Sequence, residues 1–236
     1  MNPPFFYAPD LSRESVSPEL EEETMRHMVQ VLRMKVGDEL ALTNGRGLHA
    51  LAVVSSSSKK ACTVTVNSVY DIPRVEHHVT IAISPLKNPS RFEWFLEKAA
   101  ENGIAAIVPL ICHRTERQHI KKERWNSILV SAMLQSRQCW MTELQDAASF
   151  TSCVENAVAK QKYIAHCMDG EKPELQHLVK KDHRSSLILI GPEGDFTPEE
   201  ITTALEKGFQ PVSLGSTRLR TETAGITAAV LMTHSI

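Results

Sequence analysis

The chain has 236 residues, of which 42% are hydrophobic and 23% charged, a composition typical of a globular protein with one or two domains. Its formal net charge of −2 argues against binding polyanions through bulk charge, so any nucleic-acid site must be a local patch. The five cysteines contain no C-x-x-C pair, which favours free thiols in a reducing compartment. Neither a signal peptide nor a window of about 18 apolar residues is present, so we expect a soluble cytoplasmic protein without membrane contact.

The first seventy residues predict a small β-rich domain. After an acidic helical pattern over residues 18–32, apolar and polar residues alternate as in short strands over 38–44, 48–55 and 62–70. Pro73 interrupts any strand ladder, so residues 71–78 are interpreted as a linker. We therefore expect a β-barrel or sheet domain over residues 1–72 and a second domain over residues 73–236.

Beyond residue 78, apolar runs alternate with amphipathic helical patterns. Strands are expected over 79–86, 104–111, 162–167 and 185–192, and helices over 90–103, 121–136 and 150–161. This alternation predicts an α/β fold with a parallel sheet that helices cover on both faces.

The C-terminal segment has clear helix signals. The sequence Thr197-Pro198-Glu199-Glu200 is a capping box with proline at the first helical position, and Gly208 ends that helix. A short strand within 209–215 and a final helix over 221–236 follow. Gly225 weakens the final helix by about 1 kcal/mol relative to alanine, so we expect a close contact at this position.

Two glycine-rich turns follow strands in this segment. Gly191 and Gly194 come after "LILI", and Gly215 comes after "VSL". Ligands of open α/β sheets bind beyond the carboxyl ends of the strands, so these turns predict a cofactor pocket. The alternative is ordinary turn formation. The dinucleotide pattern G-x-G-x-x-G and the P-loop pattern are both absent, which indicates a ligand that is not held by its phosphates.

The motifs around these turns resemble a known family. The stretches "LILIGPEGDFTPEEI" and "LGSTRLRTETA" are similar to the two signature motifs of the RsmE-type ribosomal RNA methyltransferases in the SPOUT superfamily. That family transfers a methyl group from S-adenosylmethionine to N3 of a uridine in 16S ribosomal RNA. The resemblance extends to residues 26–47, similar to the PUA-like barrel of the family, and to residues 83–115, similar to its first strand-helix-strand unit.

The resemblance implies a particular architecture and assembly. It implies a SPOUT-type parallel sheet with a C-terminal trefoil knot, although knots are otherwise nearly absent from proteins. It also implies a small PUA-like, RNA-binding β-barrel domain before this sheet. The family works as a homodimer on the small ribosomal subunit, so a homodimer is expected here, and no metal is expected.

The resemblance also assigns residues to the methyl donor, and the chemistry of the implied reaction points to two candidate catalytic residues. The donor site carries over to Met168, Ile190, Gly191, Pro192, Glu193, Gly194, Leu214, Gly215, Ser216, Leu219, Arg220 and Thr221. Methylation at N3 requires loss of the uracil proton, so Arg220 is the candidate that stabilises the negative charge and Glu222 the candidate that accepts the proton. Alternatively, Arg220 and Glu222 only pair with each other at the start of the helix, and Met168 is an ordinary core or loop residue.

A run of basic residues is the candidate RNA-binding surface. The run is Arg114, Arg117, Lys121, Lys122 and Arg124, and Lys87 and Arg91, which follow the strand expected over 79–86, are candidates to join it. The alternative is a solvated charged face without a ligand. The pairs His77/His78 and His113/His119 do not have the spacing of a metal site.

The chain departs from the family pattern in three places. Pro3-Pro4 stands where basic residues are usual, Asp195 stands where a third glycine is common, and "STRLR" places its arginine further from the glycine. Two other functions stay open at this point. One is a SPOUT methyltransferase that acts on transfer RNA or 23S ribosomal RNA, and the other is a non-catalytic RNA-binding factor in ribosome assembly.

Overall fold

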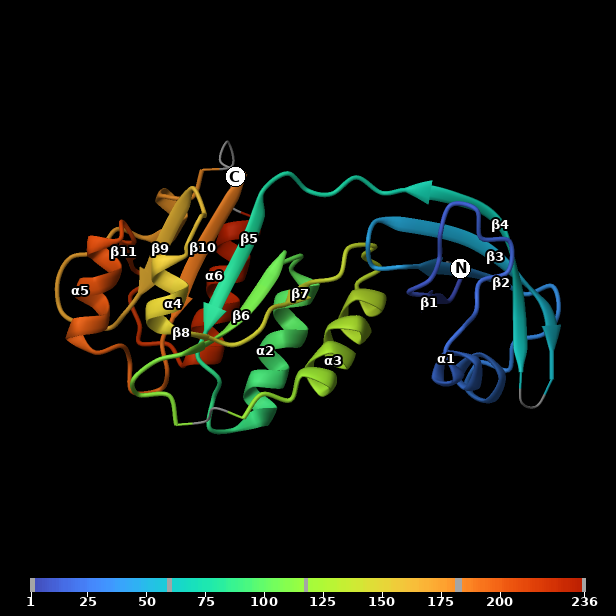
Figure 1. Ribbon diagram of the computed structural model, residues 1–236, viewed down its shortest axis with the longest axis horizontal. Coiled ribbons are helices and arrows are strands. Elements are labelled where there is room, and N and C mark those ends of the chain that lie inside the picture. The colour runs from blue at the N-terminus through green and yellow to red at the C-terminus, as the bar shows by residue number, and fades with distance from the viewer. Residues whose placement is uncertain (1–2, 59–60, 117–118, 181–183, 235–236) are drawn as a thin grey trace. The chain divides into compact units, whose positions relative to one another are not determined.

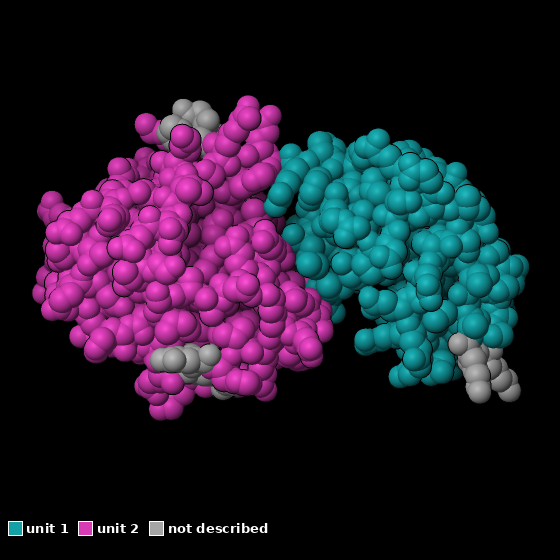
Figure 2. Space-filling view, viewed as in Figure 1, with its two compact units in different colours: residues 1–74, 130–141 teal, residues 75–129, 142–236 magenta. Residues whose placement is uncertain are grey.

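The computed structural model describes residues 3–58, 61–116, 119–180 and 184–234. The chain divides into two compact units, one of residues 1–74 with 130–141 and one of residues 75–129 with 142–236 (Figure 2). Segment 130–141 includes the end of helix α3 (Lys122–Gln135). A sequence pattern carries no signal for this grouping, because the helical period continues through residue 130 without a break.

The first unit contains a four-stranded sheet (Figure 1). Strand β1 pairs in parallel with β2, and the remaining neighbours are antiparallel. The strands are β1 (Phe5–Tyr7), β2 (Glu39–Thr43), β3 (Leu48–Ser57) and β4 (Cys62–Asp71), in the order β1-β2-β3-β4. The three alternating strands that the sequence predicts are therefore confirmed, and β1 is an additional strand.

The helix expected over residues 18–32 is shorter and wider than the pattern indicates. Helix α1 spans Glu22–Arg26, and a π-helical turn, η1, spans His27–Val31. Leu20 is buried and Glu21 is extended (φ −60°, ψ 148°), so the helix cannot start earlier. In η1 the Leu32 amide donates to the His27 carbonyl at 3.0 Å, five residues back, as in a π-helix.

The second unit contains a sheet in the order β11-β9-β10-β5-β6-β7, with β8 paired to β6 (Figure 1). Its pairings are all parallel in the described residues, as the alternating pattern predicts. The strands are β5 (His78–Ile83), β6 (Ala106–Ile111), β7 (Glu143–Leu144), β8 (Ala148–Ser149), β9 (Gln161–Ala165), β10 (Ser185–Ile190) and β11 (Gln210–Val212).

Helices cover both faces of this sheet. Leu187 and Leu189 of β10 lie in one apolar cluster with residues of α4 (Phe150–Glu155) and α5 (Pro198–Glu206). Helices α2 (Pro89–Glu101) and α6 (Thr221–His234) pack against each other, and α6 also contacts β5 and β10. Successive strand residues point to opposite faces, so Ile188 and Ile190, which are also buried, face away from the α4/α5 cluster. Burial on both faces explains the nearly continuous apolar strands.

The predicted start and end of α5 are confirmed. The Thr197 side chain accepts from the Glu200 amide, and the Glu200 carboxylate accepts from the Thr197 amide. Gly208 has a φ of 82°, a left-handed conformation that suits glycine after a helix. Helix α4 ends at Glu155 rather than near 161. The Asn156 side-chain amide donates to the Ser152 carbonyl at 2.9 Å and closes its last turn.

A 3₁₀ helix, η2 (Leu175–His177), lies between β9 and β10. Strands β10 and β11 flank β9 in the sheet, so their carboxyl ends lie at the same edge. The two glycine turns therefore emerge as near neighbours, as the sequence predicts. The strand pairings give the order of the sheet, and the trefoil knot stays a prediction.

Gly225 allows α6 to approach α2 and the sheet. A Cβ atom at Gly225 would lie 2.6 Å from the Phe95 ring and 2.8 Å from Ile83 Cδ1, closer than real Cβ atoms come. The close contact expected at this glycine is therefore confirmed.

The variant Gly225→Ala tests this contact. Helix propensity alone would raise the free energy of unfolding by about 1 kcal/mol. The contact with Phe95 instead predicts a loss of about 1–3 kcal/mol, because overpacking displaces the ring. Urea denaturation of the variant measures the sign. In a Phe95→Leu background the loss should shrink, and a Gly225→Ala protein more stable than the parent chain would contradict the packing described here.

Candidate functional site

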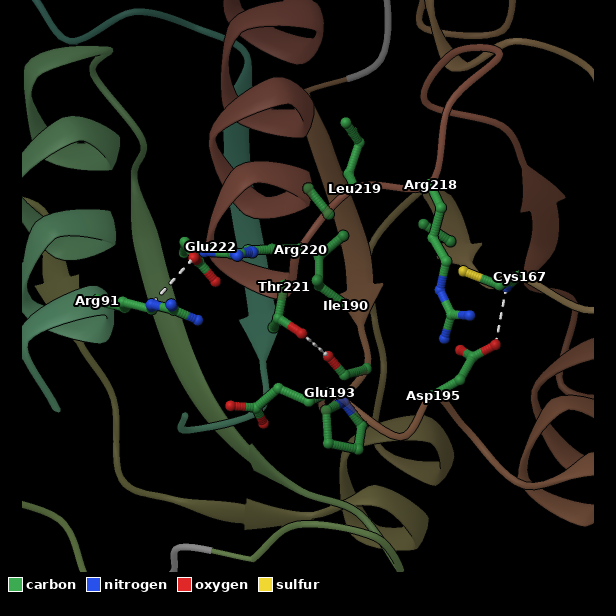
Figure 3. A pocket seen from close by; sticks show the side chains of 14 residues that line it. Arg91, Cys167, Ile190, Glu193, Asp195, Arg218, Leu219, Arg220, Thr221 and Glu222 are labelled. Carbon is green, nitrogen blue, oxygen red and sulfur yellow. Dashed lines mark hydrogen bonds and ion pairs between the residues drawn. The ribbon is translucent and has the colours of Figure 1, made fainter. Parts of the chain in front are cut away.

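A cavity of about 360 Å³ opens at the carboxyl ends of β9 and β10 (Figure 3). This volume falls within the range of about 300–1,000 Å³ that is usual for small-molecule sites. The lining comes from the end of β9, the loop after β10, the loop before α6 with the first turn of α6, and helix α2. The lining residues are Arg91, Ala165, Cys167, Ile190, Gly191, Pro192, Glu193, Asp195, Arg218, Leu219, Arg220, Thr221, Glu222 and Ala224.

A hydrogen bond joins the two loops that were expected to meet. The buried Thr221 hydroxyl donates to the Gly191 carbonyl at 3.1 Å. Gly191 itself folds tightly against Phe196, because a Cβ atom at Gly191 would lie 3.1 Å from the Phe196 ring. A side chain at this position would press on the Phe196 ring, so glycine lets the loop pack closely here while its carbonyl is bonded to Thr221.

Asp195 ties the loop after β9 to the loop after β10. It has a φ of 62°, which aspartate and asparagine tolerate better than most residues. Its carboxylate accepts hydrogen bonds from the Cys167 amide at 2.8 Å and from the Phe196 amide at 2.9 Å. A glycine would adopt this backbone more easily but could make neither bond. The departure from the family pattern at this position thus adds a link beside the cavity.

The start of the second loop is fixed at its base. The Ser213 hydroxyl donates to the Gly215 carbonyl at 2.9 Å and accepts from the Gly215 amide at 3.2 Å. Gly215 has a φ of 132°, which L side chains rarely adopt. Backbone bonds from Ser213 to Pro173 and from Leu175 to Ser213 attach this turn to the segment that contains η2.

Three arginines and three carboxylates line the cavity: Arg91, Arg218, Arg220, Glu193, Asp195 and Glu222. Glu222 is buried, with 6% of its surface exposed, and its Oε1 lies 3.7 Å from Arg91 Nε. Among the described residues no ion pair joins Glu222 to Arg220. The cation that pairs with the candidate base, Glu222, is therefore Arg91 on α2. The alternative that Arg220 and Glu222 only form an ion pair with each other is not what the structure shows.

His166 lies between two lining residues of β9 and its following loop, Ala165 and Cys167. Its Nδ1 is buried and has no hydrogen-bond partner in the described part of the chain. Burial lowers the pKa of His166 below its ordinary value and the Lys172 ammonium lowers it further, while Asp195 acts in the opposite direction. The imidazole is therefore neutral near pH 7 and adds no charge beside the cavity.

The structure brings most of the candidate donor-site residues together. The seven that line the cavity are Ile190, Gly191, Pro192, Glu193, Leu219, Arg220 and Thr221. Gly194, Leu214, Gly215 and Ser216 belong to the same loops but do not line it. Met168 is 43% exposed and lies one residue beyond the lining residue Cys167.

Sequence reasoning missed several lining residues. They are Ala165, Cys167, Asp195, Arg218 and Ala224, together with Arg91, which was grouped with the RNA-binding residues. Cys167 had a usable signal, because it directly follows a predicted strand at the carboxyl edge of the sheet. Arg91 had no such signal, because its contact with Glu222 joins two helices that are far apart in the chain.

Most of the candidate RNA-binding side chains have partners within the protein. Arg114 Nη1 donates to the Gly194 carbonyl at 2.7 Å and so supports the first loop. Lys121 is exposed, and Arg117 lies outside the described residues. The remaining ion pairs, besides that of Arg91, are Lys87 with Glu116 at 2.9 Å, Lys122 with Asp146 at 2.5 Å and Arg124 with Glu93 at 3.1 Å. Such exposed pairs contribute about 0–1 kcal/mol each, so a phosphate can replace the carboxylate.

Neither a metal cluster nor a membrane span is found in the described part of the chain. Its residues contain no group of three or more histidine, cysteine, aspartate or glutamate side chains placed to hold a metal ion. Within the same residues, no helix has the length and apolar character needed to cross a membrane.

The variant Thr221→Val tests the link between the loops. Loss of the hydroxyl leaves the buried Gly191 carbonyl without this donor, so we expect the free energy of unfolding to fall by about 1–3 kcal/mol. The control Thr221→Ser keeps the donor and should lose much less. Urea denaturation compares the two, and equal stability of the valine and serine variants would show that the bond contributes nothing.

Comparisons with known proteins place both parts of the chain in one family of RNA methyltransferases. The family model of the RNA methyltransferase domain matches residues 73–233, and that of the RNA methyltransferase PUA domain matches residues 20–67. Ribosomal RNA small subunit methyltransferase E of Synechocystis is 31% identical over 207 residues, which cover 85% of this chain and 67% of the relative. The corresponding protein of Rickettsia conorii is 28% identical, covering 89% and 86% of the two chains.

Two solved structures share the fold over nearly their whole length. A probable rRNA methyltransferase from Porphyromonas gingivalis has a TM-score of 0.88 and 36% identity, covering 96% of this chain and 95% of the other. Ribosomal RNA small subunit methyltransferase E from Neisseria gonorrhoeae, bound to S-adenosylmethionine, has a TM-score of 0.87 and 26% identity, covering 98% and 97%. The chain therefore belongs to the RNA methyltransferase family that includes ribosomal RNA small subunit methyltransferase E, with a PUA-like N-terminal domain and a SPOUT-type parallel sheet.

Proposed function

We propose that this chain transfers a methyl group from S-adenosylmethionine to N3 of a uridine in 16S ribosomal RNA. The observation that carries the proposal is the cavity between residues 190–195 and 218–222, at the carboxyl edge of the sheet. Its place in the fold is the usual place for a ligand in an open α/β sheet. Support comes from family membership and from the relative of the same fold that binds S-adenosylmethionine.

The cavity has the chemistry that this donor requires. Ile190 and Leu219 supply apolar surface, and Gly191 adds backbone without a side chain to the lining. The carboxylates of Glu193 and Asp195 favour a cationic group in the same space. When bound, S-adenosylmethionine supplies a methyl group activated by a sulfonium. We assign its binding to the candidate donor-site residues named above, with Met168, Gly194, Leu214, Gly215 and Ser216 in the outer part of the loops.

Glu222 is the proposed acceptor of the N3 proton. Its carboxylate is buried at the cavity, and Arg91 provides a counter-charge at 3.7 Å. Loss of the proton places negative charge on the uracil carbonyl oxygens, which Arg220 stabilises by donating to one of them. Such a carboxylate suits uracil better than cytosine, because cytosine N3 carries a lone pair instead of a proton.

The wider RNA contact belongs to the proposed basic surface and to the N-terminal domain. We propose a PUA-like RNA-binding domain over residues 1–72 and a methyltransferase domain over residues 73–236, a division that the limits of the two family models support. The C-terminal knot and a homodimer are part of the same proposal.

Val230 of the apolar helix α6 is 39% exposed and so available to a second copy of the chain in such a homodimer. A cytoplasmic location follows from the ribosomal substrate.

The direct test uses small ribosomal subunits from a strain that lacks this protein. The purified chain, the subunits and S-adenosylmethionine with a labelled methyl group are incubated together, and mass spectrometry identifies the labelled nucleoside. We expect 3-methyluridine in 16S RNA. Label only in transfer RNA or 23S RNA, offered in parallel, would indicate another substrate. No transfer to any RNA and no binding of S-adenosylmethionine would overturn the proposal.

Variants of the two catalytic candidates refine this test. Glu222→Gln keeps the shape of the buried side chain but cannot accept the proton, so transfer should slow by about 10²–10⁴-fold. Arg220→Ala should slow transfer by about 10²–10³-fold, because the uracil anion loses a stabilising donor. Calorimetry with S-adenosylmethionine should show that Glu222→Gln keeps the donor affinity of the unmodified chain, whereas Arg220→Ala can also weaken donor binding because Arg220 is a candidate donor-site residue. Glu206→Gln, at the exposed end of α5, is the control, and unchanged turnover in Glu222→Gln would exclude Glu222 as the base.

The basic surface is tested through its salt dependence. Replacing Lys121 and Lys122 by glutamine should weaken binding to 16S RNA and reduce the slope of log K against log salt by about one for each phosphate that the variant no longer neutralises. Lys122 must first leave Asp146, so we expect Lys121→Gln to have the larger effect of the two single variants. Filter binding at salt concentrations from about 50 to about 200 mM gives the slopes. A slope equal to that of the unmodified chain would place the RNA on another surface.

A further inference from the structure

Arg218 reaches into the cavity but has no role in the function proposed above. In Figure 3 it extends from the loop before α6 on the side of the view where Cys167 and Asp195 are drawn, and Arg91 and Glu222 are drawn on the other side. The sequence already marks this residue, since "STRLR" places an arginine further from Gly215 than the family pattern does.

The carboxylates of the cavity already interact with other groups of the protein. Asp195 accepts from the amides of Cys167 and Phe196, and Glu222 lies beside Arg91. Glu193 accepts from the backbone amide of Lys87 at 3.2 Å.

Two arginines of the lining have guanidinium donors that no carboxylate of the protein takes up. In the described residues, neither Arg218 nor Arg220 has a carboxylate within ion-pair distance. Such guanidinium groups favour the anionic part of a ligand, while the carboxylates of the same lining suit its cationic parts.

The proposed reaction brings two anionic groups to this site. One is the uracil ring after it loses its proton. Of the two arginines, Arg220 is nearer in the sequence to the proposed base, Glu222, and is therefore assigned to this anion. The other is the carboxylate of the methionine part of the donor. That carboxylate is the only anion of S-adenosylmethionine, whose ammonium and sulfonium groups are both cationic.

We propose that Arg218 binds the carboxylate of the methionine part of the donor and thereby selects for an intact amino-acid end. This inference rests on the proposed function and adds a specificity residue to it. A guanidinium can donate two parallel hydrogen bonds to a carboxylate, which a lysine ammonium cannot do in the same geometry.

The loop holds Arg218 in place on both sides. Before it, Ser213 is bonded to Gly215 and to the segment around Pro173. After it, Thr221 is bonded to Gly191. Because the backbone is fixed at both points, a ligand has to order little more than the arginine side chain, which lowers the entropic cost of binding.

Calorimetry with a matched pair of donors tests this assignment. S-adenosylmethionine and S-adenosylhomocysteine carry the carboxylate, and decarboxylated S-adenosylmethionine lacks it. Arg218→Gln should weaken binding of the first two compounds about tenfold or more, because a charge-assisted pair is lost. It should leave the affinity for the decarboxylated compound unchanged or raise it, since one repulsive charge has gone.

Two further variants act as controls. Arg218→Lys keeps the charge without the paired donors and should show an intermediate loss. Lys160→Gln also removes one exposed positive charge, but Lys160 precedes β9 and so lies at the opposite end of that strand from the cavity. Its affinities should equal those of the unmodified chain.

The possible results separate this inference from the proposed function. Equal loss of affinity for all three compounds would mean that Arg218 only shapes the loop. Unchanged donor affinity with weaker RNA binding would make it a phosphate contact. Either result overturns the inference and leaves the proposed function standing. Failure of the unmodified chain to bind either carboxylate-bearing compound would overturn both.

Discussion

The site depends on the hydrogen bond from the Thr221 hydroxyl to the Gly191 carbonyl, which joins two loops that follow different strands. Gly191 packs closely against the Phe196 ring, which a side chain at this position would press on. Asp195 adds a second link through the Cys167 amide, so the ends of β9 and β10 and the start of α6 are held together. Buried polar bonds of this kind are costly to leave unmade, which keeps the cavity walls in one arrangement.

The charges around the cavity follow from the same arrangement. The first turn of α6 buries Glu222 beside Arg91 of α2, and Gly225 lets these two helices come close enough for that contact. The loop before α6 places Arg218 toward the other end of the lining (Figure 3). The fold thus separates a region suited to a base that accepts a proton from a region suited to the charged end of a cofactor. The proposed reaction needs both.

The parts of this fold that depend on local signals could be predicted from the sequence. The capping box at Thr197 gives the start of α5, and apolar runs alternating with amphipathic helices give the parallel sheet. The two loops were predictable because strand ends and glycines mark them. The Arg91–Glu222 contact and the position of segment 130–141 were not, since both depend on packing between residues far apart in the chain. Asp195 was visible only as a missing glycine, because its bond to Cys167 exists only once β9 and β10 are paired.

The central claim is that the loops over residues 190–195 and 214–222 form the donor site. A crystal structure of the chain with S-adenosylhomocysteine, at a concentration that saturates binding in solution, tests it most directly. The account predicts the ligand between these loops, with the Thr221–Gly191 bond intact. The ligand at another position, or the two loops apart in the saturated protein, would contradict the account.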